Sequence, residues 1–360
     1  MRRRLLVTAC LILLAAVAIV PTARAQIALT VWHSWNGAPA EALARWLAEY
    51  PPATEGRTVF NVVYKPFFTL RDQLKNPPDG RGPDLYIGPS DWMGQLGRER
   101  LAIALDSRLP PAYRAELTPR AWPLVTAEGR VLGVPFALEG AALFYNRDLV
   151  ADTGVAATWE GLIRAAAALQ SGDRMGLALA PTFYPTAGLY FAAGGVLPNA
   201  GERLSPESPA WTAYQQALAA LAQAPGVLTT APDGGFDAFR EGRAAFLLGL
   251  SADYPTYREK LREKLGVLPL PTISGAAWQS LIRAQVVYVA AGTPFSEAAV
   301  DFARYLTSEA AQGIGIEAGL LPVRAGFGDE DPVAGPMLQA LTTAGVPMPP
   351  HMPELWPQFR

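Results

Sequence analysis

The chain has 360 residues, half of them hydrophobic and 17% charged, and 30 basic against 32 acidic residues give a formal net charge of −2. This composition is typical of a folded globular protein and excludes a disordered chain. The sequence beyond the N-terminus has no block rich in lysine or arginine, so we expect no nucleic-acid partner.

The N-terminus has the pattern of a secretory signal. Arg2–Arg4 precede an apolar run over 5–20, and a small-x-small motif ends at Ala25. The pattern predicts cleavage between Ala25 and Gln26, and export to the periplasm or another extracytoplasmic space. An uncleaved membrane anchor is the alternative. Cys10 is the only cysteine, so the mature chain can form no internal disulfide.

The mature chain alternates short strand-like runs with amphipathic helical stretches. Without the signal it has about 335 residues, more than one hydrophobic core usually serves, which favours two domains. The expected strands cover 27–32, 59–64, 84–88, 141–146, 244–248 and 285–290. The expected helices cover 39–50, 159–169, 236–241 and 297–306, with another beginning at Ser208–Pro209. Strand–helix repetition of this kind predicts parallel strands in an α/β fold.

Several enzyme classes are excluded because the sequence lacks their motifs. The sequence has no phosphate-binding loop, no G-x-S-x-G turn and no H-E-x-x-H pair. Its two histidines, His33 and His351, are too few for a structural zinc site and form no evident base–orienter pair. We therefore expect no catalytic residue, no metal site and no cofactor.

Two tryptophans follow predicted strands. Trp35 stands beside Asn36, and Trp92 stands beside Asp91. Ligands of open α/β sheets bind beyond the carboxyl ends of the strands. An aromatic face beside carboxylate and amide groups suits a sugar, whose C–H surface it covers while the polar groups bind hydroxyls. Ordinary packing of these tryptophans is the alternative.

Four parts of the sequence carry a resemblance to a known family. They are Thr30–Gly37, Gly82–Trp92, Gly133–Leu149 and the pair Phe239–Phe246 with Ala303–Ala311. In their order and spacing they resemble the extracytoplasmic solute-binding proteins of sugar ABC importers (family 1), and most nearly the maltose and maltodextrin-binding proteins.

The resemblance implies an α/β chain with the two-lobed type II periplasmic binding-protein fold. The ligand cleft would lie between lobes joined by crossing strands, and hinge closure would clamp the ligand. We expect a signal peptide at 1–25, an N-terminal lobe at 26–138 plus 286–320, and a C-terminal lobe at 139–285 plus 321–360.

The resemblance also implies ligand-binding residues. Asp91 and Glu139 match carboxylates that accept hydrogen bonds from sugar hydroxyls, whereas Tyr184 and Trp356 match stacking rings. The full expected set is Ser34, Trp35, Asn36, Asp91, Trp92, Glu139, Tyr184, Asp253 and Trp356.

This sequence departs from the family pattern at three places. Trp92 replaces a common basic residue, Gly37 replaces a common lysine, and the segment that holds Asp253 lacks a stacking tryptophan. These departures leave the particular sugar open.

The sequence therefore predicts a monomeric binding protein that captures a carbohydrate, such as maltose or a malto-oligosaccharide, and delivers it to an ABC permease. Two alternatives remain open. One is a secreted glycosidase that uses Asp91 and Glu139 as its two carboxylates. The other is the same fold with a cationic ligand such as a polyamine, held by Asp91, Glu139 and Asp253 together with tryptophan rings.

Overall fold

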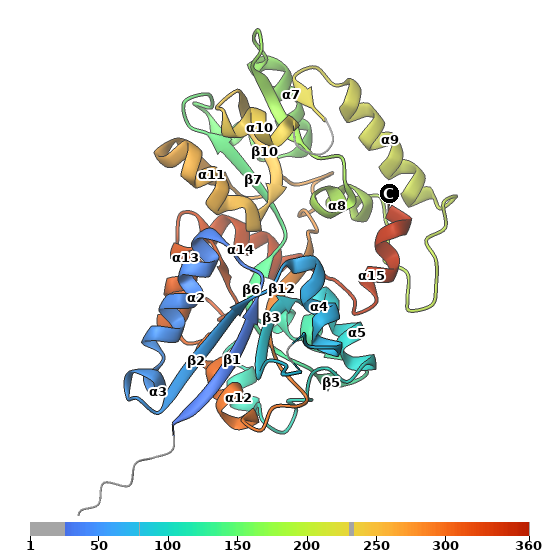
Figure 1. Cartoon of the computed structure of the whole chain (residues 1–360). Coiled ribbons are helices and arrows are strands. Elements are labelled where there is room, and N and C mark those ends of the chain that lie inside the picture. Colours follow the sequence, from blue (N-terminus) through green and yellow to red (C-terminus); the bar gives the residue numbers. More distant parts are fainter. Residues whose placement is uncertain (1–25, 79, 230–233, 360) are drawn as a thin grey trace, which may run out of the picture.

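The computed structural model describes residues 26–78, 80–229 and 234–359. The predicted signal at 1–25 lies outside the described residues. Figure 1 shows two lobes, each built on its own β-sheet with helices around it. Within the described part of the chain, no helix combines the length and the apolar character needed to cross a bilayer.

The first lobe contains a seven-stranded mixed sheet. Its order is β13-β6-β12-β3-β1-β2, with β14 paired to β12 outside this path. The strands are β1 (Ile27–His33), β2 (Thr58–Tyr64), β3 (Leu85–Pro89), β6 (Val134–Glu139), β12 (Leu281–Val289), β13 (Leu321–Pro322) and β14 (Val346–Pro347). The neighbours β2, β1 and β3 are parallel, as the strand–helix repetition predicts, whereas β12 is antiparallel to both β3 and β6.

The longer helices of the first lobe bury an apolar face. In α2 (Gly37–Glu49) the face formed by Ala42, Leu43, Trp46 and Leu47 is buried. The Trp46 indole also donates a 2.8 Å hydrogen bond to the Ala311 carbonyl in α13 (Glu309–Glu317). The other helices of this part are α3 (Pro51–Thr54), α4 (Phe67–Lys75), α5 (Met93–Arg98), α6 (Pro111–Arg114) and α12 (Ser296–Tyr305). A small hairpin of β4 (Thr126–Ala127) and β5 (Arg130–Val131) lies beside them.

The second lobe contains a five-stranded sheet in the order β11-β7-β10-β8-β9. These strands are β7 (Ala141–Asn146), β8 (Met175–Leu179), β9 (Val227–Leu228), β10 (Ala244–Leu250) and β11 (Leu265–Leu268). Its helices are α7 (Trp159–Leu169), α8 (Phe183–Ala192), α9 (Pro209–Gln223), α10 (Gly234–Arg240) and α11 (Tyr254–Leu261).

Two predicted helix starts in this lobe are confirmed by capping hydrogen bonds. The Thr158 hydroxyl accepts from the Gly161 amide at 3.0 Å, and the Ser208 hydroxyl accepts from the Trp211 amide at 3.3 Å. A side-chain acceptor at this position satisfies an amide that has no partner inside the helix.

The lobes are joined where β6 passes into β7 through Gly140. A Cβ on Gly140 would lie 2.4 Å from Leu341 and 2.8 Å from the Ser280 hydroxyl, so a larger residue would displace these buried side chains. The Ser280 hydroxyl accepts from the Ala141 amide at 2.9 Å, and the Ser251 hydroxyl accepts from the Gly140 amide at 3.2 Å. The crossing strand is therefore held on both sides by segments far away in the sequence.

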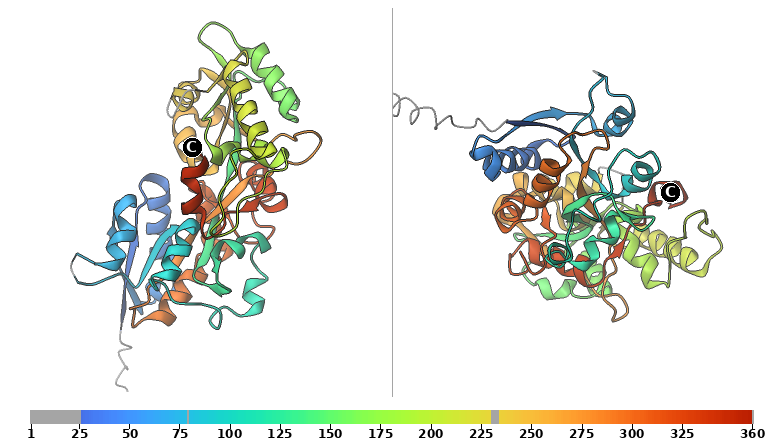
Figure 2. Two further views of the ribbon diagram at one scale, coloured as in Figure 1. Left: turned by 90° about the vertical axis from the view of Figure 1, so that its right-hand side faces the viewer. Right: turned by 90° about the horizontal axis from the view of Figure 1, so that it is seen from below.

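The C-terminal segment passes along both lobes, and we call residues 344–359 the C-terminal strap. It follows α14 (Ala334–Thr343) and contains β14, α15 (Met352–Leu355) and a 3₁₀ turn, η7 (Trp356–Phe359). β14 pairs with β12 of the first sheet, whereas Met352, Leu355 and Phe359 are buried in the core of the second lobe. In the left view of Figure 2, α15 (red) lies where the two lobes meet.

Strand pairing differs from the expected lobe boundaries at two places. The pairing of β12 with the first sheet begins at Leu281, whereas the sequence predicts that this part of the first lobe begins at 286. Leu321–Pro322 pair with β6 of the first sheet, whereas the sequence predicts the second lobe for 321–360. A two-residue strand has no periodicity that a sequence could reveal. Arg283 interrupts the apolar residues at the start of β12, so the strand that the sequence predicts begins only at Gln285.

Candidate functional site

A buried ion pair lies at the end of β6, next to the crossing between lobes. Glu139, the last residue of β6, is 5% exposed. Its Oε2 accepts a hydrogen bond of 2.5 Å from Nε of Arg283, and its Oε1 accepts one of 2.7 Å from Nε2 of Gln285. Both donors stand on β12, in which Arg283 pairs with Glu139 across the strands. The carboxylate is thus held by two donors of the same strand.

One aromatic ring lies against the arginine of this pair, and a second ring packs beside the first. Tyr184, near the start of α8, has its ring 5.4 Å from the Arg283 guanidinium, which is the geometry of a cation–π contact. The Trp356 ring lies 6.0 Å from the Tyr184 ring at an angle of 55°. Trp356 is the first residue of η7 in the C-terminal strap. The cluster therefore joins the first sheet, α8 and the strap.

Two further carboxylates interact electrostatically with Arg283. Asp91 lies in the 3₁₀ turn η1 (Ser90–Trp92) directly after β3, and Asp253 ends the turn η5 (Ser251–Asp253) after β10. Burial raises the pKa of Asp91, with a smaller contribution from Glu139, while Arg283 and the Trp356 indole act in the opposite direction. Burial and the Glu139 charge raise the pKa of Asp253 to about 6, against a lowering by Arg283.

Arg283 stays protonated in this setting. Burial lowers the pKa of its guanidinium, but the negative charge of Glu139, together with Tyr184 and Asp91, outweighs burial and raises the pKa. Burial raises the pKa of the Tyr184 hydroxyl, so that group stays neutral. Three carboxyl groups and one arginine thus share one poorly solvated region. We call Asp91, Glu139, Tyr184, Asp253, Arg283 and Trp356 the cleft cluster.

Two polar atoms of the cleft cluster have no hydrogen-bond partner among the described residues. They are Oδ1 of Asp91 and the hydroxyl of Tyr184, and both are buried. Buried polar groups in native proteins are nearly always paired, so unpaired ones in a functional region are available to a ligand. A ligand rich in hydroxyl groups could donate to the Asp91 oxygen and bond with the Tyr184 hydroxyl.

The sequence matches a family of known function. The family of bacterial extracellular solute-binding proteins matches residues 46–343. This chain belongs to that family. Proteins of this family are extracellular, which agrees with the export that the N-terminal pattern predicts.

Individual relatives of this solute-binding protein match over shorter stretches. The maltotriose-binding protein of Pyrococcus abyssi (strain GE5 / Orsay) is 25% identical over 125 residues, which are 34% of this chain and 27% of the relative. Maltodextrin-binding protein MdxE of Bacillus subtilis (strain 168) is 29% identical over 97 residues, 27% of this chain and 22% of the relative. These matches span about a quarter of either relative.

Solved structures match over nearly the whole length. A cyclo/maltodextrin-binding protein complexed with maltotetraose has a TM-score of 0.77 at 23% identity, covering 92% of this chain and 89% of that one. The Thermus thermophilus maltotriose binding protein bound with maltotriose has a TM-score of 0.74 at 26% identity, with 89% of each chain covered. These likenesses confirm the predicted two-lobed α/β fold.

The remaining expected site residues have other surroundings in this solute-binding protein. Trp35 is half-buried and packs on Trp46 and Phe136, with ring centroids 6.3 and 5.7 Å away. Trp92 is 4% exposed, and its ring lies against Phe67 at 5.3 Å. Both rings thus have the packing contacts that the alternative interpretation predicts, and a role in binding ligand stays a prediction for each.

The start of α2, which follows the loop of Ser34 and Asn36, shares a pocket with the start of α11, which follows Asp253. Asn36 is exposed and makes no side-chain capping bond to α2. A pocket of about 430 Å³ is lined by Ala38 of α2 and by Tyr254 of α11, the neighbour of Asp253. The first turns of α2 and α11 therefore lie on opposite sides of one pocket. The hydrogen bonds and ring contacts of the described residues do not connect Ser34 or Asn36 to the cleft cluster.

Sequence reasoning missed Arg283 and Gln285. Both belong to β12, and the strand that the sequence predicts at 285–290 includes Gln285 but not Arg283. A usable signal was present, because two long polar side chains at alternate positions of an otherwise apolar strand point to one face of the sheet. Groups of three or more histidine, cysteine or acidic residues able to hold a metal ion do not occur in the described chain.

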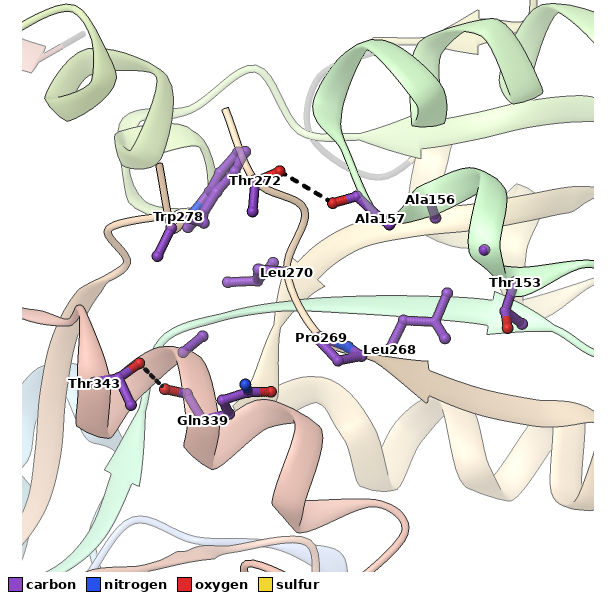
Figure 3. A pocket seen from close by; sticks show the side chains of 13 residues that line it. Thr153, Ala156, Ala157, Leu268, Pro269, Leu270, Thr272, Trp278, Gln339 and Thr343 are labelled. Carbon is purple, nitrogen blue, oxygen red and sulfur yellow. Dashed lines mark hydrogen bonds between the residues drawn. The ribbon is translucent and has the colours of Figure 1, made fainter. Parts of the chain in front are cut away.

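The pocket in Figure 3 lies apart from the cleft cluster. It has a volume of about 420 Å³ and lies between the second lobe and α14, with Thr153, Leu270, Trp278, Gln339 and Thr343 among its lining residues. Its lining holds no charged side chain and none of the cleft-cluster residues. We therefore place the candidate site at the cleft cluster, where hydrogen-bonding groups and aromatic faces occur together.

Proposed function

We propose that this solute-binding protein is the substrate-binding component of an ABC importer that captures a malto-oligosaccharide or a related oligosaccharide. The observation that carries the proposal is the cleft cluster, which combines carboxylates of the first lobe with aromatic rings attached to the second. It agrees with the Thermus thermophilus structure, 26% identical over 89% of each chain and bound with maltotriose.

The chemistry of the cleft cluster suits a sugar. Oδ1 of Asp91 can accept a hydrogen bond from a ligand hydroxyl, and the Tyr184 hydroxyl can donate or accept one. The Tyr184 and Trp356 rings offer apolar faces to the C–H side of a sugar ring. The sites proposed for the ligand are Ser34, Trp35, Asn36, Asp91, Trp92, Glu139, Tyr184, Asp253 and Trp356, to which we add Arg283.

The positions of these groups support capture by closure of the lobes. Asp91, Glu139 and Arg283 belong to the first sheet or its loops, whereas Tyr184 and Asp253 belong to the second lobe. A ligand that contacts both sets binds the closed arrangement more tightly and shifts the population towards it. We propose that the closed monomer then docks on the permease.

We propose binding without hydrolysis. Both oxygens of Glu139 already accept hydrogen bonds from Arg283 and Gln285, so this carboxylate is poorly placed to act as a general acid. Incubating the pure protein with maltotriose should release no new reducing ends. Steady release of glucose or maltose would instead support a glycosidase that uses Asp91 and Glu139.

The N-terminal pattern supports export by a cleavable signal. We propose that the mature protein begins at Gln26. Intact-mass measurement of protein secreted by a bacterial host should show the loss of residues 1–25. A full-length mass in the membrane fraction would instead support the uncleaved anchor.

A ligand screen tests the binding function directly. A ligand that binds only the folded protein must raise its melting temperature. We expect a rise with maltose, maltotriose and maltotetraose, and a smaller rise or none with trehalose and spermidine. A rise with spermidine alone would replace the sugar with a cationic ligand, since Asp91 and Asp253 would then find a counter-charge. No rise with any of the five would contradict the proposed function.

A further inference from the structure

Three exposed aromatic side chains gather within five residues of the first lobe. They are Tyr64 at the end of β2 and Phe67 and Phe68 at the start of α4, with exposed fractions of 49%, 42% and 89%. We call them the aromatic lip. Exposed apolar groups that gather in one patch mark a binding surface more often than scattered ones do.

The aromatic lip stands at the ligand-binding edge of the first sheet. β2 runs parallel to β1, which runs parallel to β3, so the carboxyl ends of all three meet at one edge. The expected ligand loop of Ser34 and Asn36 follows β1, and Asp91 follows β3. Figure 1 shows α4 in the part of the first lobe nearer the second lobe, and α12 at the far end.

Ring contacts lead from the aromatic lip to Trp92, the sequence neighbour of Asp91 in the cleft cluster. The Phe67 ring lies 5.3 Å from the ring of Trp92, the residue directly after Asp91. The Phe68 ring meets the edge of Phe67 at 5.5 Å and 84°. Because Phe68 is 89% exposed, most of its ring surface is free of protein contacts. The lip is thus anchored on Trp92, one residue along the chain from Asp91 of the cleft cluster.

Tyr64 of the lip packs against a neutral ring of the first lobe. Tyr64 meets the His33 ring edge-on at 6.0 Å, and burial lowers the pKa of His33, which favours its neutral form. Because the His33 ring is neutral, it adds no charge beside the exposed face of the Tyr64 ring. Such faces suit the C–H surface of a sugar ring, and a platform held in place loses little conformational freedom when a ligand arrives.

We propose that the aromatic lip is an additional subsite, which stacks against the outer rings of an oligosaccharide whose inner rings occupy the cleft cluster. The inference rests on the proposed function and adds a preference for longer chains. Phe68 is its main contact, because it offers the largest free surface, and Phe67 positions it against Trp92.

Binding measurements along a series of chain lengths test the proposal. Affinities for maltose, maltotriose, maltotetraose and maltohexaose would be measured by calorimetry for the unaltered protein, Phe68→Ala and Phe68→Trp. The control is Phe295→Ala, since Phe295 is also exposed, at 38%, but precedes α12 at the far end of the lobe. Phe68→Ala should weaken maltohexaose binding roughly three- to tenfold, the value of one stacking contact. Maltose binding should change less than about twofold, a difference near the noise of such measurements.

The other outcomes separate the two proposals. Equal losses at every chain length, or none at any length, would overturn the subsite while leaving sugar capture in place. Reduced uptake in cells with unchanged sugar affinity would overturn it in favour of a permease contact. Phe68→Trp should retain the preference for long chains, and its loss there would count against stacking. Failure of the unaltered protein to bind any of these sugars would overturn the proposed function and the subsite together.

Discussion

The ion pair between Glu139 and Arg283 allows a quantitative test of how the cleft cluster is held. The side chains of Glu139 and Arg283 are 6% and 24% exposed, so solvent screens their charges only weakly. Glu139→Gln leaves the guanidinium without its close partner, and Arg283→Met leaves three carboxyl groups without a cation. Each single change should cost about 3 kcal/mol, the usual penalty for a charge left unpaired in a protein interior.

The double variant should cost clearly less than the sum. Once both charges are absent, neither is left unpaired, so the coupling between the two changes should be about 2–3 kcal/mol. The entropy of unfolding, about 2.1 cal/mol/K per residue, comes to about 0.7 kcal/mol/K for the mature chain. A loss of about 3 kcal/mol therefore lowers the melting temperature by about 4 °C.

Scanning calorimetry and urea unfolding of the four proteins without sugar measure this coupling. The exposed pair of Arg45 and Glu317 is a matched control, because its contact is also 2.5 Å while its side chains are 47% and 66% exposed. Breaking that pair should change the stability much less than breaking the buried pair, because solvent screens both charges. If the two changes in the cleft cluster add to within about 0.5 kcal/mol, the pair is not coupled and the argument from burial is refuted.

Three further predictions concern other parts of the site. Burial, assisted by Glu139, raises the pKa of Asp253 to about 6, so the folded state retains a proton that the unfolded chain releases near pH 4, and stability falls as pH rises between about 4 and 6. Asp253→Asn should flatten that fall in urea titrations and raise stability at pH 7 by on the order of 2 kcal/mol. Trp356→Ala should weaken maltotriose binding about tenfold in calorimetry, whereas Trp356→Phe should keep most of the affinity. Gly94→Ala should weaken sugar binding as well, because its Cβ would lie 2.1 Å from the Pro350 carbonyl and displace the C-terminal strap.

Controls make these outcomes decisive. Gly313→Ala has free space around the new methyl group inside α13, so it should stabilise the protein by up to about 1 kcal/mol and leave binding unchanged. Unaltered maltotriose affinity in Trp356→Ala would remove this ring from the site. A pH dependence that survives in Asp253→Asn would assign the titration to another group. Normal binding in Gly94→Ala would show that the strap tolerates the shift.

Local signals in the sequence predicted much of the fold. Thr158 and Ser208 have side chains that can cap a helix, and each helix begins where its cap indicates. Capping depends on one residue and its immediate neighbours, so it can be read without knowledge of the fold. The expected strand at 141–146 coincides with β7, and the one at 244–248 lies within β10. Both are short apolar runs, which are also a local signal.

Long-range features could not be predicted in the same way. The position of β12 between β6 and β3 is set by pairing with strands far away in the sequence, and its polar residues obscured its start. Arg283 was missed because its partner Glu139 is its neighbour only in the folded sheet. For Trp35 and Trp92, the sequence places each ring after a strand but does not decide whether it turns inward or towards a ligand.

The place of β12 in the first sheet has a consequence for the order of folding. The strand inserts between β6 and β3, yet it is synthesised only after every strand of the second sheet. The first lobe therefore cannot complete its core while the chain is growing, and closing its sheet requires contacts between segments far apart in sequence, which are slow to form. A newly made chain of this design remains incompletely folded through most of its synthesis, and neither lobe can be produced alone by cutting the chain once.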